Sequence, residues 1–225
     1  MRRIILLGYA RQDSHRCRHK MTRPFGDSTL FERYLKKFMD IQHLEHPFSR
    51  ILMAIYPGDL WLHDITKKSS VTLVERNEKS VAQGTEKLSE IQHYLKEYDE
   101  EYVLVVNGCF PFLMPETIIR VGNFLKENSW VKSLSCVRYR YNHFWDAVTH
   151  RPINNTDTTC LSTRLLPPVL ENVNSMVGYS RDYMLTHDAY WGCEKNDPYL
   201  YTFPESIELL DIDTELDFRI GEALV

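Results

Sequence analysis

Short apolar runs alternate with longer amphipathic segments over more than half of the chain. The runs predict strands near residues 4–7, 51–55, 71–74, 103–106 and 131–137. The segments between them predict helices at about 29–42, 79–97 and 115–127, and the last begins at Pro115, which suits a first helical turn. This alternation indicates an α/β fold with a mainly parallel, twisted sheet and helices on both faces. Ligands of such sheets bind at the carboxyl ends of the strands.

The pattern changes after about residue 138. Residues 138–172 are rich in aromatic residues, Asn, Thr and Pro without a helical period, which favours an inserted arm or hairpin. A further strand is predicted near 176–179, followed by a terminal helix that Thr214 can cap, with Asp217 three residues later. We expect one domain over residues 1–225 that carries this insertion.

Composition places the chain among ordinary globular proteins, with 43% hydrophobic and 26% charged residues. No apolar run reaches the roughly 18–20 residues of a membrane helix. The opening MRRIILLGYA resembles a signal peptide, but its apolar stretch is short and charged residues follow it. We therefore expect a buried first strand and a cytoplasmic protein without a membrane partner. The five cysteines are scattered and form no CxxC, which argues against a disulfide framework and a cysteine metal site.

The loop after the first strand is unexpectedly basic for a chain of net charge −4. Residues 9–26, YARQDSHRCRHKMTRPFG, hold five Lys or Arg, two His and one acidic residue. The patch is too short for nucleic acid, and the rest of the chain is acidic. Two interpretations stay open here: a solvated surface loop, or a cradle for a polyphosphate at the edge of the sheet. It is not a P-loop, because GxxxxGK[ST] is absent.

The spacing within this loop matches a known motif. Ala10, Arg11, Ser14, Arg16 and Lys20 spell A-R-x-x-S-x-R-x-x-x-K. This resembles the signature loop of the CTP-dependent sugar-acid cytidylyltransferases, the CMP-Kdo and CMP-sialate synthetases. The resemblance implies a Rossmann-like fold of the nucleotide-diphospho-sugar transferase type. It also implies that these five residues bind the nucleotide, with the two Arg and the Lys acting in catalysis on the triphosphate.

Two further stretches resemble the same family in the same order. Arg76 followed by QGTEKL at 83–88 is similar to R…SGTER(L/I), which implies that Arg76, Gly84 and Thr85 lie near the base and ribose. NGCFPFL at 107–113 resembles the QGDEPF or QPTSPL turn, which implies that Asn107 and Gly108 also bind the nucleotide. In this turn Cys109 stands where CMP-Kdo synthetases have an Asp, so a metal ligand from it is not expected.

The end of the chain supplies two acidic residues. DIDTELDF at 211–218 resembles the family ending D-x-D-T-x-x-D-F, which implies that Asp211 and Asp213 bind Mg²⁺. Residues two apart on an extended segment share a face, and Mg²⁺ prefers oxygen ligands. The alternative is that Asp213 or Thr214 only caps the last helix.

Acceptor residues are implied by the same resemblance. Asn174 begins NSMVGYSRD, which is similar to the acceptor-binding strand, and His143 resembles a position near the acceptor. A purely structural role for His143 stays equally open.

The resemblance implies a Mg²⁺-dependent enzyme that transfers CMP from CTP to an acidic acceptor and releases pyrophosphate, in surface polysaccharide biosynthesis. The expected acceptor is a sugar acid such as Kdo or a nonulosonic acid, and the alternative is a small phosphate or phosphonate. A non-catalytic nucleotide-binding protein on the same fold is the third hypothesis, and Cys109 favours it. Residues 138–172 lie where relatives carry a dimerisation arm, so we expect a homodimer.

Overall fold

The computed structural model describes residues 2–12, 14, 16–81, 87–155 and 162–225. Its central sheet has the order β5-β4-β1-β6-β8-β7-β9. These strands are β1 Ile4–Tyr9, β4 Arg50–Ile55, β5 Thr72–Glu75, β6 Tyr102–Asn107, β7 Ser133–Arg140, β8 Val169–Ser180 and β9 Tyr199–Thr202. Within this sheet, β8 alone runs against the others, which confirms the mainly parallel prediction.

Both faces of the sheet are buried, because successive side chains of the central strands point to opposite faces. Ile4 and Leu6 belong to the core under helices α1 (Leu30–Gln42) and α4 (Pro115–Glu127). Ile5 and Leu7 belong to a second core on the other face. Tyr94 and Leu95 cover this core together with Met184, which belongs to helix α5 (Arg181–His187). The prediction of helices on both faces is therefore confirmed.

Helix ends follow the signals in the sequence. Thr29 and Glu32 form a capping box at the start of α1, after the small hairpin of β2 (Pro24–Phe25) and β3 (Ser28–Thr29). Thr214 and Asp217 form a second box at the start of the terminal helix α6 (Glu215–Glu222), as predicted. Helix α2, Leu60–Lys68, is an additional element that we did not predict.

The predicted helix over 79–97 is wrong. The described part of this stretch consists of the 3₁₀ turn Glu78–Ser80, the single turn α3 (Leu88–Ile91) and the 3₁₀ helix His93–Glu97. The Asn77 side chain accepts from the backbone N–H of Ser80 and sets up the first turn. Tyr94 and Leu95 at the end of this stretch are buried against β1 and β6, and the described residues reach the sheet through short turns instead of one amphipathic helix.

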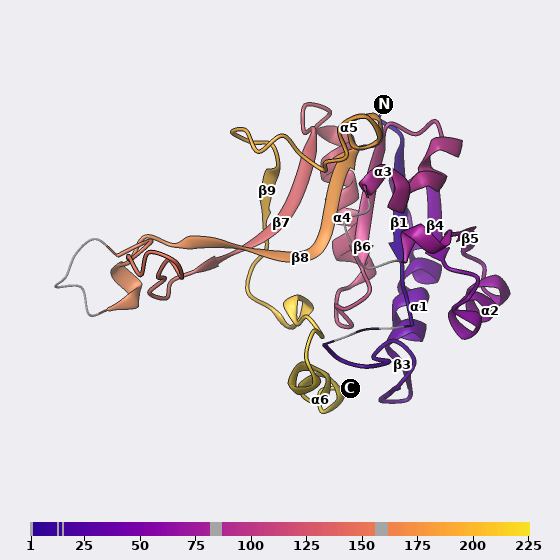
Figure 1. Cartoon of the computed structure of the whole chain (residues 1–225), viewed down its shortest axis with the longest axis horizontal. Helices are drawn as coiled ribbons and strands as arrows, with labels where there is room; N and C mark the ends of the chain where they lie inside the picture. Colours follow the sequence, from indigo (N-terminus) through magenta and orange to yellow (C-terminus); the bar gives the residue numbers. More distant parts are fainter. Residues whose placement is uncertain (1, 13, 15, 82–86, 156–161) are drawn as a thin grey trace.

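Strands β7 and β8 continue beyond the sheet as a long two-stranded arm (Figure 1). The predicted strand at 176–179 is only the sheet end of β8. The register of the pair shifts between Ser135 and Val137, and Asn174 opposite has a positive φ of 55°. This irregularity marks the point at which β8 leaves β6 and enters the arm. No helix in the described part of the chain is long and apolar enough to cross a membrane.

Candidate active site

A cavity of about 530 Å³ opens at the carboxyl ends of β1, β5 and β6. The loop after β1 forms one wall, with all five residues of the basic motif facing the cavity: Ala10, Arg11, Ser14, Arg16 and Lys20. The loop therefore brings three of its positive charges, Arg11, Arg16 and Lys20, to one cavity.

The other walls come from the remaining motifs. Arg76 follows β5, and Asn107 and Gly108 follow β6, and all three line the cavity. Asn174 reaches it from the bulge of β8. Gly84 and Thr85 lie outside the described residues.

His143 is not brought to this cavity. It lies on the arm, with its Nδ1 3.3 Å from Nδ2 of Asn155. Within one protomer, the predicted acceptor role of His143 therefore has no geometric support.

Two cations of the basic loop contact the acidic end of the chain. Arg16 Nη1 lies 2.6 Å from Oδ2 of Asp213. The buried ammonium of Lys20 donates to the Ile212 carbonyl and lies 3.4 Å from Oδ1 of Asp213. Burial opposes the charge on Lys20, but Cys109, Asp213 and Asp211 outweigh it and raise the pKa of the lysine. Lys20 is therefore a fixed positive charge at the base of the cavity.

Asp211 is the least satisfied acid of the site. Its Oδ1 is buried and has no hydrogen-bond partner among the described residues, and Asp211 lines the same cavity as Asp213. Burial, and after it the neighbouring Asp213, raises the pKa of Asp211 to about 6. A buried carboxylate oxygen without a partner is unfavourable unless a cation completes its surroundings.

The two carboxylates are a donor set that suits Mg²⁺. This ion takes one or two carboxylates, and substrate phosphates and water complete its shell. Among the described residues there is no group of three or more His, Cys, Asp or Glu arranged around a metal, so a site built from protein alone is not supported there. The pair Asp211 and Asp213 therefore fits an ion that arrives with a polyphosphate.

Another part of the cavity wall is formed by Arg76. Its guanidinium is buried, donates to the Ser80 and Ala10 carbonyls, and lies 5.4 Å from the centre of the Tyr9 ring. Within the part of the chain that the structure describes, its Nε has no hydrogen-bond partner. An aromatic ring and a planar cation beside backbone carbonyls form a surface suited to a nucleobase.

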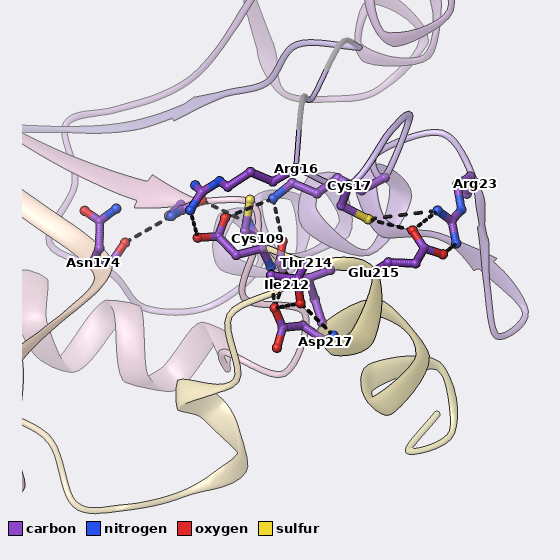
Figure 2. Close-up of polar contacts among 12 residues, drawn as sticks. Arg16, Cys17, Arg23, Cys109, Asn174, Ile212, Thr214, Glu215 and Asp217 are labelled. Atoms are coloured by element: carbon purple, nitrogen blue, oxygen red, sulfur yellow. Dashed lines mark hydrogen bonds and ion pairs between the residues drawn. The ribbon is translucent and has the colours of Figure 1, made fainter.

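The remaining cations of the loop are not all free for a ligand. Arg23 binds Glu215 through two contacts of 2.8 Å and stacks on Phe218. Arg23, the largest cause, lowers the pKa of Glu215 to about 2. Figure 2 shows this pair on one side of Arg16 and Cys109, with Asn174 on the other. The pair attaches the basic loop to α6, which brings the acidic segment before α6 to the phosphate side of the cavity.

Comparison with known proteins identifies the family. The family model described as cytidylyltransferase matches residues 4–208. The chain belongs to the cytidylyltransferase family. No curated protein matches its sequence.

Solved cytidylyltransferase structures share the fold over nearly the whole chain. The 4-diphosphocytidyl-2C-methyl-D-erythritol synthase from Anaerococcus prevotii is 14% identical, with a TM-score of 0.65 over 99% of this chain and 98% of that one. A CMP:2-keto-3-deoxy-manno-octonic acid synthetase complexed with CTP is 10% identical, with a TM-score of 0.66 over 99% and 98%. The bifunctional IspDF from Campylobacter jejuni is 9% identical, with a TM-score of 0.60 over 96% of this chain and 53% of that one. At these identities the likeness shows the fold alone.

Some lining residues escaped the sequence analysis. They are Tyr9, Met21, Ser80, Ile91 and Cys109. Tyr9 and Cys109 stand directly beside predicted site residues, so their position was a usable signal. Ser80 and Ile91 belong to the stretch that we predicted as one helix, and only the observed path brings them to the cavity.

Proposed function

We propose that this cytidylyltransferase transfers CMP from CTP to a small acidic acceptor and releases pyrophosphate. The observation that carries the proposal is the single cavity lined by Arg11, Arg16 and Lys20 together with Asp211 and Asp213. The cavity thus combines cations that would neutralise a triphosphate with carboxylates that would hold its metal.

The chain's own residues supply positioning and charge. The acceptor oxygen attacks the α-phosphorus, the bond from this phosphorus to the bridging oxygen breaks, and pyrophosphate leaves with that oxygen. The acceptor's proton passes to solvent. Arg11, Arg16 and Lys20 neutralise the charge that develops on the leaving group, which is where fixed cations lower the barrier most. Arg76 and Tyr9 hold the base where they line the same cavity.

Asp211 and Asp213 are the residues that would hold Mg²⁺. When bound, the ion polarises the phosphate oxygens and orients them for in-line displacement. Release of Arg16 from Asp213 frees this carboxylate and lets the guanidinium turn toward the phosphates.

Asn174 is our candidate for acceptor binding. Its side chain lines the cavity opposite the basic loop, and its positive φ presents it from the bulge. Arg138 and Arg140 are engaged on the arm with Glu171 and Glu205, so they are poorly placed to recognise an acid group. We propose a sugar acid such as Kdo or a nonulosonic acid as the acceptor, for surface polysaccharide biosynthesis in the cytoplasm.

A small phosphate or phosphonate is the second candidate acceptor. The observation that favours it is Cys109, which replaces an acidic residue in the turn beside the phosphate side of the cavity. An anionic group meets less repulsion there. Burial, partly offset by Lys20, raises the pKa of Cys109.

A pyrophosphate-release assay tests the function. Purified protein is incubated with CTP, Mg²⁺ and each member of a panel of sugar acids, phosphates and phosphonates. Release that depends on one acceptor supports the proposal and identifies the acceptor class. Calorimetry that detects CTP binding while no acceptor of either class is turned over supports a non-catalytic protein instead.

We further propose that the arm forms a homodimer. It exposes large apolar side chains that a monomer rarely displays together, namely Trp145, Val148, Ile153 and Leu165. Light scattering at micromolar concentration should give twice the mass of the chain. A monomer under these conditions would contradict the proposal.

A further inference from the structure

The phenol of Tyr34 reaches from helix α1 to the place where β1 and β6 end. In this parallel pair the N–H of Tyr102 donates to the carbonyl of Arg3. Hydrogen bonds of this kind recur at every second residue along a parallel pair. The register therefore makes the N–H of Tyr9 and the carbonyl of Val106 partners at the end of the pair. The Tyr34 hydroxyl contacts both groups, accepting from Tyr9 N at 3.2 Å and donating to Val106 O at 2.6 Å.

Both strand ends leave room for this side chain. A Cβ atom at Gly8 would lie 2.7 Å from the Tyr34 hydroxyl, and one at Gly108 would lie 2.8 Å from its ring. Neither approach is sterically possible without movement. The ring is fully buried and packs edge-on against Phe31 and Phe38. The sequence thus keeps side chains away from Tyr34 on both strands, and the ring itself has little freedom to move.

The groups that Tyr34 holds lead directly to the cavity walls. The guanidinium of Arg76 lies over the ring of Tyr9. Asn107, which follows Val106, accepts from the N–H of Cys109 at 3.0 Å and donates to the carbonyl of Asn174 at 3.1 Å. Tyr34 therefore lies beneath both the wall assigned to the base and the turn that carries Asn107.

We propose that Tyr34 is a positioning residue whose hydroxyl sets the separation of the ends of β1 and β6, and with it the placement of Tyr9 and Asn107 around the nucleotide. The proposal rests on the proposed function, because CTP is the ligand that the two walls receive. Burial raises the pKa of Tyr34 far above its usual range, so the hydroxyl keeps its proton and donates.

Replacement of the hydroxyl tests the proposal with CTP as the probe. Tyr34→Phe keeps the ring and removes only the bridging oxygen. At a temperature far below unfolding, calorimetry should show CTP binding weakened about five- to thirtyfold. The matched control is Tyr102→Phe, because the Tyr102 hydroxyl is also buried but finds no hydrogen-bond partner in the described residues. The control should bind CTP within twofold of wild type.

A double-mutant cycle separates positioning from general destabilisation. If Tyr34 acts through Asn107, Tyr34→Phe should cost less than threefold in CTP affinity in an Asn107→Ala background. Gly8→Ala, whose new methyl group would lie 2.7 Å from the Tyr34 hydroxyl and 2.6 Å from Cε of Met53, provides a second way to crowd this hydroxyl should Tyr34→Phe not fold. Wild-type affinity in either folded variant, or full additivity with Asn107→Ala, would overturn the positioning role. Failure of the wild type to bind CTP would instead refute the proposed function.

Discussion

Arg16 lies on Asp213, with 2.6 Å between the guanidinium and a carboxylate oxygen. The contact joins the basic loop after the first strand to the acidic segment before the last helix. In our account the same guanidinium serves the phosphates of CTP, so one ion pair connects the anion-binding and metal-binding halves of the site.

Replacement of Arg16 by alanine should weaken CTP binding without unfolding the protein. Loss of one charge-assisted phosphate contact costs about 1.5–3 kcal/mol, which corresponds to about ten- to a hundredfold in affinity. The side chain is 71% exposed, so the melting temperature should change little. Calorimetry should show Arg18→Ala, an exposed cation of the same loop that does not line the cavity, binding as wild type. Equal affinity for Arg16→Ala and Arg18→Ala would return the loop to the solvated-surface interpretation.

The metal and cap roles of the acidic ending can be separated with two variants. Asp217 closes the capping box with Thr214, whereas Asp213 faces the cavity. Asp213→Asn should therefore melt close to wild type but lose several orders of magnitude of Mg²⁺-dependent turnover. Asp217→Asn should lose about 0.5–2 kcal/mol of stability and keep its turnover. Normal Mg²⁺-dependent activity in a stable Asp213→Asn variant would contradict the metal assignment.

Asp211 should show a trade-off between stability and activity. Its buried oxygen without a partner lies near a second carboxylate, so Asp211→Asn relieves an unfavourable charge in the nucleotide-free protein. Since Asp211 is only partly buried, we expect a gain of about 1 kcal/mol in the free energy of unfolding near pH 8. Turnover should fall sharply at the same time. Thermal unfolding beside the pyrophosphate assay checks both results, and a less stable Asp211→Asn protein would disagree with this account.

Lys37 predicts a pH dependence of stability outside the cavity. Its ammonium is buried in α1 and donates to the carbonyl of Phe110, and burial, followed by Arg33, lowers its pKa from 10.5 to about 7. Between these pH values the unfolded state binds more protons than the folded state. Stability linked to Lys37 is therefore lowest below pH 7 and rises as the pH increases toward 10.5.

Urea unfolding at pH 6 and pH 9 measures this effect. Wild type should gain about 2–3 kcal/mol over this interval relative to Lys37→Met. Lys36→Met is the matched control, because the neighbouring Lys36 is exposed and pairs with Asp40 on the helix surface. A Lys37→Met difference that does not change with pH would show that the amine keeps an ordinary pKa.

The sequence predicted those parts of the fold and site that depend on local pattern. Short apolar runs predicted the central strands. The spacing of Thr214 and Asp217 predicted the capping box of α6. Motifs that follow β1, β5 and β6 meet because the carboxyl ends of parallel strands share one edge. Arg16 and Asp213 could be expected near each other for this reason, although nothing in the sequence implies their direct contact.

What the sequence could not predict depends on tertiary context. The stretch over 79–97 has helical spacing, yet its described part forms only short helical turns, whose buried residues pack on the sheet. Asn174 gains its position from a bulge that arises only when β8 changes partners. In the sequence, Tyr34 is indistinguishable from the other apolar residues of an amphipathic helix. Its hydroxyl is placed at the ends of β1 and β6 only by the packing of α1 on these strands.

Transfer of CMP is the central claim, and phosphorus NMR of a reaction mixture tests it most directly. Protein, CTP and Mg²⁺ are incubated with each acceptor. The signals of CTP and pyrophosphate are followed with time, together with any new phosphodiester from a sugar acid or any new phosphoanhydride from a phosphate or phosphonate. We predict that one acidic acceptor gives pyrophosphate and a CMP conjugate in equal amounts, and that Asp213→Asn gives neither. Bound CTP that stays intact with every sugar acid, phosphate and phosphonate would contradict the claim.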